Sequence, residues 1–428
     1  NGNDLTQPTS SQQPIFNTGL INGLPGLTFD GLNDLMDATS IAALESDDIT
    51  YFVVYERSLL MDQALIYAGY TSENDKWGTY CNPANNRLIS KHKSPTNKVV
   101  YFDDAGTPSF MSTQFGATQT RTYQQGTLEA SLTTSYTAGT GHQLLRIGGY
   151  TANETAYILD GFISEVVLYN TALNDLERIM VENYLGAKYN LSIPTDRYSH
   201  QATHNIELIG IGNDGTNSQT TAQGKGIVEF SGATSLDAGD YLLAAHTDGF
   251  SVPSDTTDVD IPASIPNHVR FQRTWRVDET NDCGTVTVTF KLSGAEDFGA
   301  SAEYRLLVDD DGNFSDASVI PGSYSGGEVS FTHDFTSGQQ FFTLAGLTQQ
   351  LDIESITSGP WNDEGTWDCT CIPTASDNVT ILAPDDVNVD VDAFVNAMTP
   401  NIKTSVCDGE PMKAFRDLKA IVIYDYLD

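Results

Sequence analysis

The sequence contains little basic charge. Lysine and arginine together number 21, against 57 acidic residues, and the formal net charge is -36. A protein that binds nucleic acid or an anionic membrane surface presents a basic face. The composition therefore argues against both partners. An acidic surface leaves carboxylates for divalent cations, so calcium is the expected cofactor, with adaptation of the surface to salty water as the alternative.

Long apolar runs are also absent. No stretch of 18 apolar residues occurs, and the N-terminus has neither a charged nor an apolar leader region, so we expect no membrane insertion. The five cysteines are too few for a disulfide scaffold and do not show zinc-site spacing. We predict a structural disulfide that involves Cys369, Cys371 or Cys407, and buried thiols at Cys81 and Cys283.

Recognisable catalytic motifs are missing. The sequence has no nucleophile elbow, phosphate-binding loop or dinucleotide fingerprint, and no Glu-x-Asp-x-x-Glu strand of the kind that retaining glucanases use. Glu165 stands alone among apolar residues and is interpreted as a solvent-facing strand position. His200 and His204 have the spacing of a helical metal site but lie in a polar stretch that we interpret as a linker. The sequence predicts that the protein is not an enzyme.

The most informative segment is 158–194. An apolar, β-branched run, 163–169, is followed by Asn174 and Glu177 in a capping-box arrangement, which predicts the start of a helix. Apolar residues then recur on one helical face, and Pro194 marks the stop. The remaining sequence indicates strands, so a lone helix closes a strand-rich domain near Pro194.

Three segments carry a resemblance to a known family. They are NGNDLTQPTSSQQPIF at the start, INGLPGLTFDGLNDLM at 21–36, and DGFISEVVLYNTALNDLERIMVENYLGAKYN at 160–190. In order and spacing they resemble the concanavalin A-like, laminin-G-type jelly-roll domain of secreted Bacteroidetes multidomain surface proteins. The resemblance implies a jelly roll over residues 1–195 that is truncated at its N-terminus.

Two further sequence patterns follow the first domain. Alternating strands separated by polar turns predict a second antiparallel β-sandwich over 196–348, with Val286, Val288, Phe290 and Leu292 pointing inward. Residues 349–428 are expected to begin a third β-rich module. The part from 353 to 391 resembles the opening of stalk or β-helix modules in proteins exported by the type IX system, while the tail after Phe394 departs from that pattern. The expected fold class is all-β.

Aromatic and polar residues in expected loops of the first domain are candidates for sugar binding. Sugar rings stack on flat aromatic faces, and amide or carboxylate groups bond their hydroxyls. Core positions remain the alternative for Trp77 and Tyr101. The candidate ligand-binding residues are Trp77, Tyr80, Tyr101, Asp103, Asp104, Tyr123, Tyr150 and Asn153.

An acidic turn in the second domain is the candidate calcium site. The sequence VDDDGNFSD offers oxygen ligands from Asp309, Asp311 and Asn313, although it lacks the twelve-residue spacing of an EF-hand. A hairpin turn explains the same residues equally.

These features predict a non-catalytic adhesion or glycan-binding protein of the bacterial cell surface, located outside the cell. Its expected partners are a polysaccharide or surface glycan and the secretion and surface-attachment machinery. A structural spacer, or a passenger region of a type IX cargo without a ligand, is the alternative. A polysaccharide-active enzyme with catalytic groups on the rim of the sandwich is a third reading.

Overall fold

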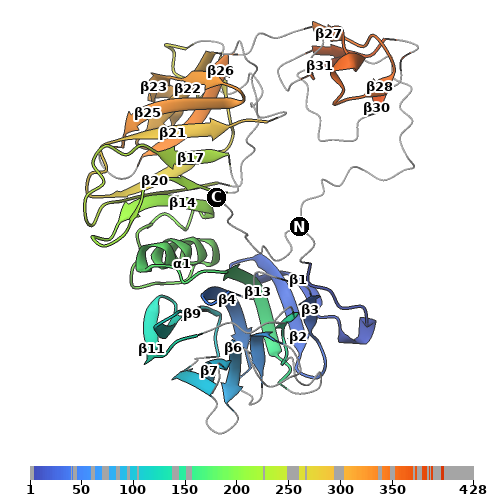
Figure 1. The fold of residues 1–428 in the computed structure, drawn as a ribbon. Helices are drawn as coiled ribbons and strands as arrows, with labels where there is room; N and C mark the ends of the chain where they lie inside the picture. The colour runs from blue at the N-terminus through green and yellow to red at the C-terminus, as the bar shows by residue number, and fades with distance from the viewer. Residues whose placement is uncertain are drawn as a thin grey trace. The chain divides into compact units, whose positions relative to one another are not determined.

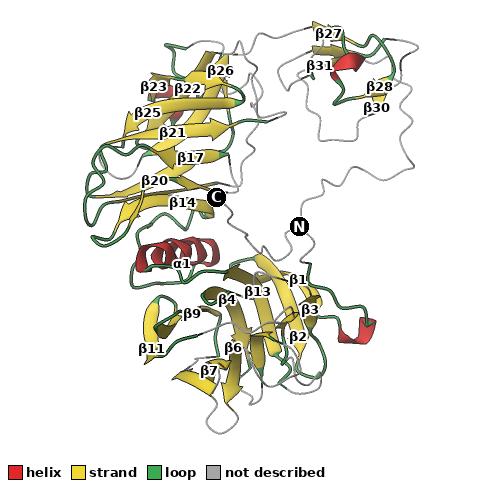
Figure 2. Cartoon of the chain, in the orientation of Figure 1, coloured by secondary structure: helices red, strands yellow, loops and turns green. Residues whose placement is uncertain are grey.

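The structure is a computed structural model. It describes residues 4–39, 41, 46–58, 63–69, 77–82, 87–93, 97–103, 106–136, 144–150, 157–224, 227–247, 260–265, 268–293, 303–335, 340–347, 352–369, 372–373, 378–382, 385, 387–388 and 397–399. The chain divides into two compact units, residues 1–196 and residues 197–414. Strands dominate both units (Figure 2).

Two antiparallel sheets form the first unit (Figure 1). The seven-stranded sheet has the order β1-β2-β13-β4-β9-β10-β11, and the six-stranded sheet has the order β3-β12-β5-β6-β7-β8. The strands are β1 (Ile15–Ile21), β2 (Leu24–Asp30), β3 (Met36–Thr39), β4 (Ile49–Arg57), β5 (Ala64–Ala68), β6 (Trp77–Asn82), β7 (Arg87–Lys93), β8 (Asn97–Phe102), β9 (Ser109–Phe115), β10 (Gln119–Gln124), β11 (Thr127–Thr133), β12 (Leu144–Ile147) and β13 (Asp160–Tyr169). This arrangement is the expected jelly-roll sandwich with a helix at its C-terminal end.

Strand β4 is buried on both faces, which explains its continuous apolar sequence. Tyr51, Val53 and Tyr55 belong to the core between the two sheets. Phe52 and Val54 belong instead to a second apolar cluster that includes residues of helix α1 (Asp175–Tyr189). The helix therefore covers the outer face of the seven-stranded sheet.

The predicted helix start is confirmed. Asn174 accepts a hydrogen bond from the Glu177 amide, and the Glu177 side chain accepts one from the Asn174 amide, so the capping box is complete. Such a cap stabilises a helix by about 1 kcal/mol. The expected stop at Pro194 is too late: the helix ends at Tyr189, where Asn190 adopts a left-handed conformation with φ 52°. Asparagine tolerates this conformation better than other residues with side chains do.

Glu165 is not solvent-facing as interpreted from the sequence. Its side chain is buried, and it accepts hydrogen bonds from the Tyr184 hydroxyl at 2.9 Å and the Lys188 ammonium at 2.8 Å. Both partners come from α1. The helix thus supplies the polar groups that a buried carboxylate requires.

The second unit contains the expected second antiparallel sandwich. One sheet has the order β15-β14-β18-β20-β26-β22-β23 with β19 beside β26, and the other has the order β16-β17-β21-β25-β24. The strands are β14 (Ile206–Asn213), β15 (Ser218–Gln219), β16 (Ala222–Gln223), β17 (Val228–Ser231), β18 (Tyr241–His246), β19 (Val269–Arg270), β20 (Trp275–Thr280), β21 (Thr285–Lys291), β22 (Glu303–Asp309), β23 (Ser318–Pro321), β24 (Ser323–Ser325), β25 (Glu328–Asp334) and β26 (Phe341–Leu347).

The predicted inward residues of this sandwich are confirmed. Val286, Val288 and Phe290 are completely buried, and Leu292 is 7% exposed. His200 and His204, interpreted as linker residues, are 7% and 5% exposed. They are buried because the segment that carries them is held to β20 by hydrogen bonds, among them one from the Tyr198 hydroxyl to the Arg276 carbonyl.

A third set of strands in the second unit pairs in parallel. β27 (Asp352–Glu354), β29 (Asn378–Thr380) and β31 (Ala397–Thr399) form one ladder, while β28 (Gly359–Pro360) and β30 (Val387–Asn388) form another. Strands that alternate between two parallel ladders are typical of a β-solenoid. Trp361 and Trp367 fill its small core, with ring centres 5.0 Å apart. Three short 3₁₀ turns complete the described elements: Ser10–Gln12, Phe314–Asp316 and Glu364–Thr366.

The predicted disulfide is confirmed at Cys369, which is disulfide-bonded. Cys371 and Cys407 lie outside the described residues. Cys81 and Cys283 are buried thiols that form no disulfide, as expected. The domain boundary expected after residue 348 and the tail after Phe394 stay predictions.

Candidate functional site

Four tyrosines gather on the six-stranded sheet of the first unit. Side chains alternate along β6, so that Trp77, Thr79 and Cys81 face the core, and Tyr80 lies on the opposite face. Tyr67 of β5 lies on that same face. Tyr150 and Tyr157, from the connection between β12 and β13, pack against these two strand residues. We call Tyr67, Tyr80, Tyr150 and Tyr157 the tyrosine cluster.

Tyr150 lies at the centre of the tyrosine cluster. Its ring centre is 4.3 Å from that of Tyr67, 6.0 Å from that of Tyr80 and 5.4 Å from that of Tyr157. Tyr80 and Tyr157 meet edge to face at 5.6 Å. The Tyr67 hydroxyl donates a hydrogen bond to the Tyr150 hydroxyl at 3.3 Å. The four ring contacts are tilted or edge to face, and edge-to-face packing is an arrangement that aromatic pairs favour.

Burial differs within the tyrosine cluster. Tyr67 is completely buried, while Tyr80, Tyr150 and Tyr157 are half-buried. Burial, together with the adjacent Tyr150 hydroxyl, raises the pKa of Tyr67 above its usual value, so this phenol stays protonated. Tyr67 is therefore a buried, neutral support for the tyrosine cluster, and the other three tyrosines are partly exposed to solvent.

Two backbone features hold the tyrosine cluster in place. Gly78 lies opposite Tyr67 in the sheet, where a Cβ atom would overlap the Tyr67 ring. Tyr157 has a φ of 61°, a conformation that is uncommon for residues other than glycine. Strained backbone of this kind persists where the surroundings enforce it, and it concentrates at ligand sites.

An ion pair between the buried Arg146 and the partly exposed Asp37 anchors the loop that carries Tyr150. Arg146 of β12 donates two hydrogen bonds to the Asp37 carboxylate, at 2.7 and 2.6 Å, and a third to the Tyr150 carbonyl at 3.1 Å. The Arg146 side chain is 3% exposed. The Asp37 carboxylate is therefore held by a bidentate contact with Arg146.

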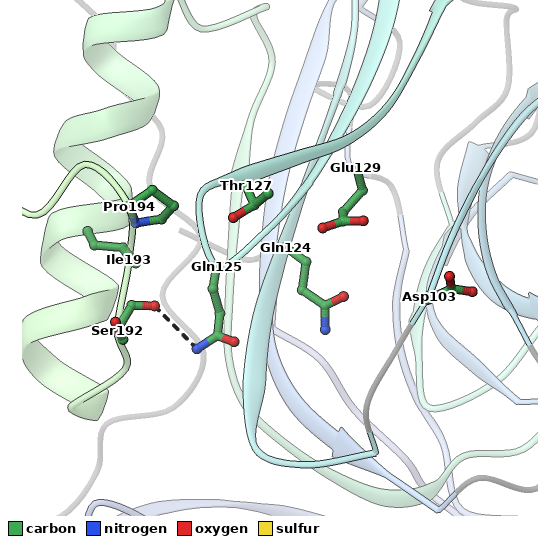
Figure 3. Close-up of a pocket in the computed structure, with 8 residues that line it drawn as sticks. All are labelled: Asp103, Gln124, Gln125, Thr127, Glu129, Ser192, Ile193 and Pro194. Carbon is green, nitrogen blue, oxygen red and sulfur yellow. Dashed lines mark hydrogen bonds between the residues drawn. The ribbon is translucent and has the colours of Figure 1, made fainter.

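A second candidate is a polar groove beside the hairpin β10–β11. Its volume is about 630 Å³. Figure 3 shows Gln125 of the hairpin pointing toward Ser192, with the Gln125 amide donating a hydrogen bond to the Ser192 carbonyl at 3.4 Å. Six of its eight lining residues carry a hydroxyl, amide or carboxylate side chain that can form hydrogen bonds with a polyhydroxy ligand. The lining residues are Asp103, Gln124, Gln125, Thr127, Glu129, Ser192, Ile193 and Pro194.

The structure brings together two of the residues that the sequence predicted for ligand binding, Tyr80 and Tyr150. Asp103 lies elsewhere, in the lining of the groove, where Arg87 pairs with it at 2.8 Å. Tyr101 lies in β8 opposite Ile89. Asp104 and Asn153 lie outside the described residues.

Of the two interpretations of Trp77, the core position is confirmed and the sugar-binding position is not. Trp77 is completely buried, and its ring stacks on that of Tyr51 with centres 5.2 Å apart. It faces inward because its position in β6 has the same parity as the core residues Thr79 and Cys81. Tyr123 also does not present its ring to a ligand: it is 5% exposed, and the Arg178 guanidinium covers it.

Sequence reasoning missed Tyr67 and Tyr157. Tyr67 lies in an apolar run that indicates a core strand, and its contact with Tyr80 depends on the pairing of β5 with β6. The one local signal was the sequence GGYTANETAYILDG, whose two tyrosines both join the tyrosine cluster.

The acidic turn of the second unit is held by its own backbone. One carboxylate oxygen of Asp309 accepts hydrogen bonds from the Asp311 amide at 2.8 Å and the Gly312 amide at 2.5 Å. Asp311 accepts one from the Asn313 amide at 2.8 Å. Among the described residues, no group of three or more His, Cys, Asp or Glu side chains is arranged to hold a metal ion. The hairpin-turn interpretation accounts for these contacts, and calcium stays a prediction.

One family model matches part of the chain. A family model described as a domain of unknown function (DUF8202) matches residues 177–339, which is less than half of the chain. No curated protein matches the sequence.

Within the part of the chain that the structure describes, none of the helices has the length and hydropathy of a membrane span.

Several solved structures are similar to part of the chain. One is the carbohydrate-binding module CBM40 of a Ruminococcus gnavus sialidase bound to α2,3-sialyllactose, with 18% identity, 32% of this chain and 84% of that chain covered, and a TM-score of 0.28. Another is domain 4 of an extracellular arabinanase from Geobacillus stearothermophilus in complex with arabinotriose, with 12% identity, coverage of 39% and 79%, and a TM-score of 0.30. A pentraxin from Limulus polyphemus matches with 10% identity, coverage of 35% and 74%, and a TM-score of 0.27. Structural similarity at these TM-scores does not indicate a shared function.

Proposed function

We propose that the first unit binds glycans through the tyrosine cluster, as part of a non-catalytic adhesion protein outside the bacterial cell. The observation that carries this proposal is the packing of Tyr80, Tyr150 and Tyr157, all half-buried, around the buried Tyr67. Partly exposed rings on a rigid base provide apolar faces for the C–H groups of a sugar and phenol groups for its hydroxyls.

Preorganisation supports a binding role. The rings are fixed by one another, by the Arg146 contact to the Tyr150 backbone and by the close approach at Gly78. A site whose side chains are ordered before the ligand arrives loses less conformational entropy on binding. The attachment of such a protein to the surface through the type IX export route belongs to the same proposal.

The test is binding of the full chain to a glycan array, followed by affinities for the glycans retained. We expect Tyr80→Ala and Tyr150→Ala each to weaken binding by about five- to thirtyfold, since loss of one stacking contact costs about 1 to 2 kcal/mol. Tyr324→Ala is the matched control. Tyr324 is a half-buried tyrosine of the second unit that stacks on Tyr304 with ring centres 5.2 Å apart.

Two further variants test the groove as the alternative location. Gln124→Ala and Glu129→Ala remove lining groups without touching the tyrosine cluster. If they abolish binding while the tyrosine variants do not, the glycan site lies in the groove. Retention of no glycan at all would instead support a structural spacer.

A further inference from the structure

A segment at the start of the second unit is attached to strand β20. Residues 197–204 follow directly after the last residue of the first unit. The Ser199 amide and hydroxyl both donate hydrogen bonds to one oxygen of the Asp278 carboxylate, each at 2.7 Å. The Tyr198 hydroxyl donates one to the Arg276 carbonyl at 3.3 Å. We call residues 197–204 the covering segment.

The covering segment lies on the outer face of its sheet. Trp275 and Val277 of β20 belong to the core between the two sheets of the sandwich. Arg276 and Asp278 alternate with them along the strand, so their side chains lie on the opposite face. The contact of the covering segment with the Asp278 carboxylate places it on this same face.

Three of the seven histidines of the chain gather at this contact. His200 and His204 belong to the covering segment and His246 belongs to β18, and all three are buried. The two ring nitrogens of His204 lie 2.9 Å from the Thr203 hydroxyl and 3.3 Å from the Thr274 hydroxyl. The groups that hold the His204 ring are therefore uncharged.

An arginine lies close to His204. The Arg276 guanidinium carbon is 4.6 Å from the centre of the Phe341 ring, and the His204 ring centre is 5.4 Å from it. The two side chains thus share one aromatic neighbour. A proton on His204 would place a second positive charge beside this guanidinium, away from bulk water.

The other two histidines each have a carboxylate nearby. His200 Nε2 is 3.8 Å from an oxygen of Asp278, and His246 Nε2 is 3.4 Å from an oxygen of Glu207. A proton on either ring would gain an opposite charge. Protonation of His204 is therefore the step that this arrangement opposes most.

The pKa shifts agree with this geometry. Burial lowers the pKa of His204 from 6.5 to about 4, and Arg276, His200 and His246 act in the same direction. Burial and Arg276 also lower the pKa of His200, while Asp278 opposes them. A histidine with a lowered pKa stabilises the folded state above its unfolded pKa, and this contribution is lost as the pH falls through the folded pKa.

We propose that the covering segment detaches from its sheet in mild acid, when His204 takes up a proton. Detachment relieves the repulsion from Arg276 and returns the imidazolium to water. Because the segment follows the first unit directly, its release lengthens the free connection between the two units, while both sandwiches stay folded. The proposal is independent of the glycan site.

Hydrogen exchange of the full chain tests the proposal through peptides that cover residues 197–204. After correction for the intrinsic effect of pH on exchange, the equilibrium constant for local opening should rise by about tenfold or more from about pH 7.5 to about pH 5. Peptides from β21 should stay protected over the same range. An unchanged opening constant, or an equal loss of protection in β21, would overturn the proposal.

Variants assign the effect to His204. His204→Gln retains a side chain that bonds hydroxyls but takes up no proton, so it should abolish most of the rise. His333→Gln is the matched control, since His333 of β25 is a partly buried histidine whose pKa is also lowered by burial, and it should leave the rise unchanged. A full rise in His204→Gln, or loss of the rise in His333→Gln, contradicts the proposal.

Arg276→Gln provides a second test that keeps His204 in place. Removal of the neighbouring cation should make protonation of His204 in the attached state easier, so the opening constant should rise several-fold less on acidification than in the parent chain. A rise of the parent size in this variant would show that repulsion by Arg276 does not drive detachment.

Discussion

The guanidinium carbon of Arg178 lies 4.0 Å from the centre of the Tyr123 ring. This contact joins helix α1 to strand β10, whose hairpin with β11 forms one wall of the groove. The same guanidinium donates a hydrogen bond to Glu182 at 2.5 Å. Arg178 therefore contacts an aromatic ring and a buried carboxylate at the same time.

Glu182 is completely buried, and one of its carboxylate oxygens has no hydrogen-bond partner among the residues that the structure describes. Burial raises the pKa of Glu182, and the bond from Arg178 acts in the opposite direction. That carboxylate oxygen lies beneath the hairpin turn, 3.1 Å from where a Cβ on Gly126 would stand. The Arg178–Glu182 pair therefore lies against the turn of this hairpin.

The first prediction concerns this pair. Arg178→Met should lower the free energy of unfolding of the first unit by about 3 kcal/mol at pH 7, because it leaves a buried carboxylate without a counter-charge. Glu182→Gln in the same chain should recover part of the loss. Urea denaturation, followed through hydrogen exchange of α1, measures both changes.

The pH dependence of this variant has a defined sign. A carboxyl whose pKa is raised by folding favours the folded state at low pH, and this contribution is lost as the pH rises through the folded pKa. The penalty of Arg178→Met should therefore shrink on acidification. Arg121→Met, which breaks a pair between Arg121 and Asp175 at the surface, should cost below about 1 kcal/mol. Equal losses in the two variants would contradict the prediction.

The second prediction concerns Glu279 in β20. Burial raises its pKa from 4.5 to about 7, and the nearby Asp282 and Asp334 act in the same direction, whereas a hydrogen bond from the Cys283 amide opposes them. The folded state therefore retains a proton between pH 4.5 and 7 that the unfolded chain releases. The stability contribution is present below pH 4.5 and is lost as the pH rises through about 7.

Glu279→Gln should remove this dependence. The variant should be more stable than the parent chain at pH 8 by about 1 to 2 kcal/mol, a value reduced for the partial exposure of the carboxyl, and the difference should vanish at pH 4. Denaturant titrations across this pH range measure it. Glu328→Gln removes an equal charge from a side chain that is 53% exposed. A similar gain in that control would show that net charge, and not burial, is responsible.

The third prediction concerns calcium at Asp309, Asp311 and Asn313. A bound ion stabilises the folded state according to its concentration relative to the dissociation constant. Binding at this turn should therefore raise the thermal midpoint in about 5 mM Ca²⁺ relative to EDTA, and Asp311→Asn should remove most of the rise. Mg²⁺ is the control cation. An unchanged midpoint would leave these carboxylates with the single role of accepting hydrogen bonds from the turn amides.

Local features of the sequence predicted local structure well. The capping box at Asn174 and Glu177 needs four consecutive residues, and the alternation from Val286 to Leu292 needs one strand, so both are encoded within a few residues. The tyrosine cluster is different. Tyr80 and Tyr150 could be listed as candidates from composition, but nothing local indicates that they touch each other or Tyr67.

The sequence by itself determined the all-β class, the position of the helix and the inward face of the clearest strand, because these depend on side-chain period and on capping within one element. Tertiary structure alone decided which face of β6 became the core. Trp77 and Tyr80 differ by three positions in one strand, so they lie on opposite faces, and only the packing of the six-stranded sheet against the seven-stranded one placed Trp77 inside and Tyr80 outside. Glu165 likewise became buried because a helix from a later part of the chain covers its strand and brings Tyr184 and Lys188 to it.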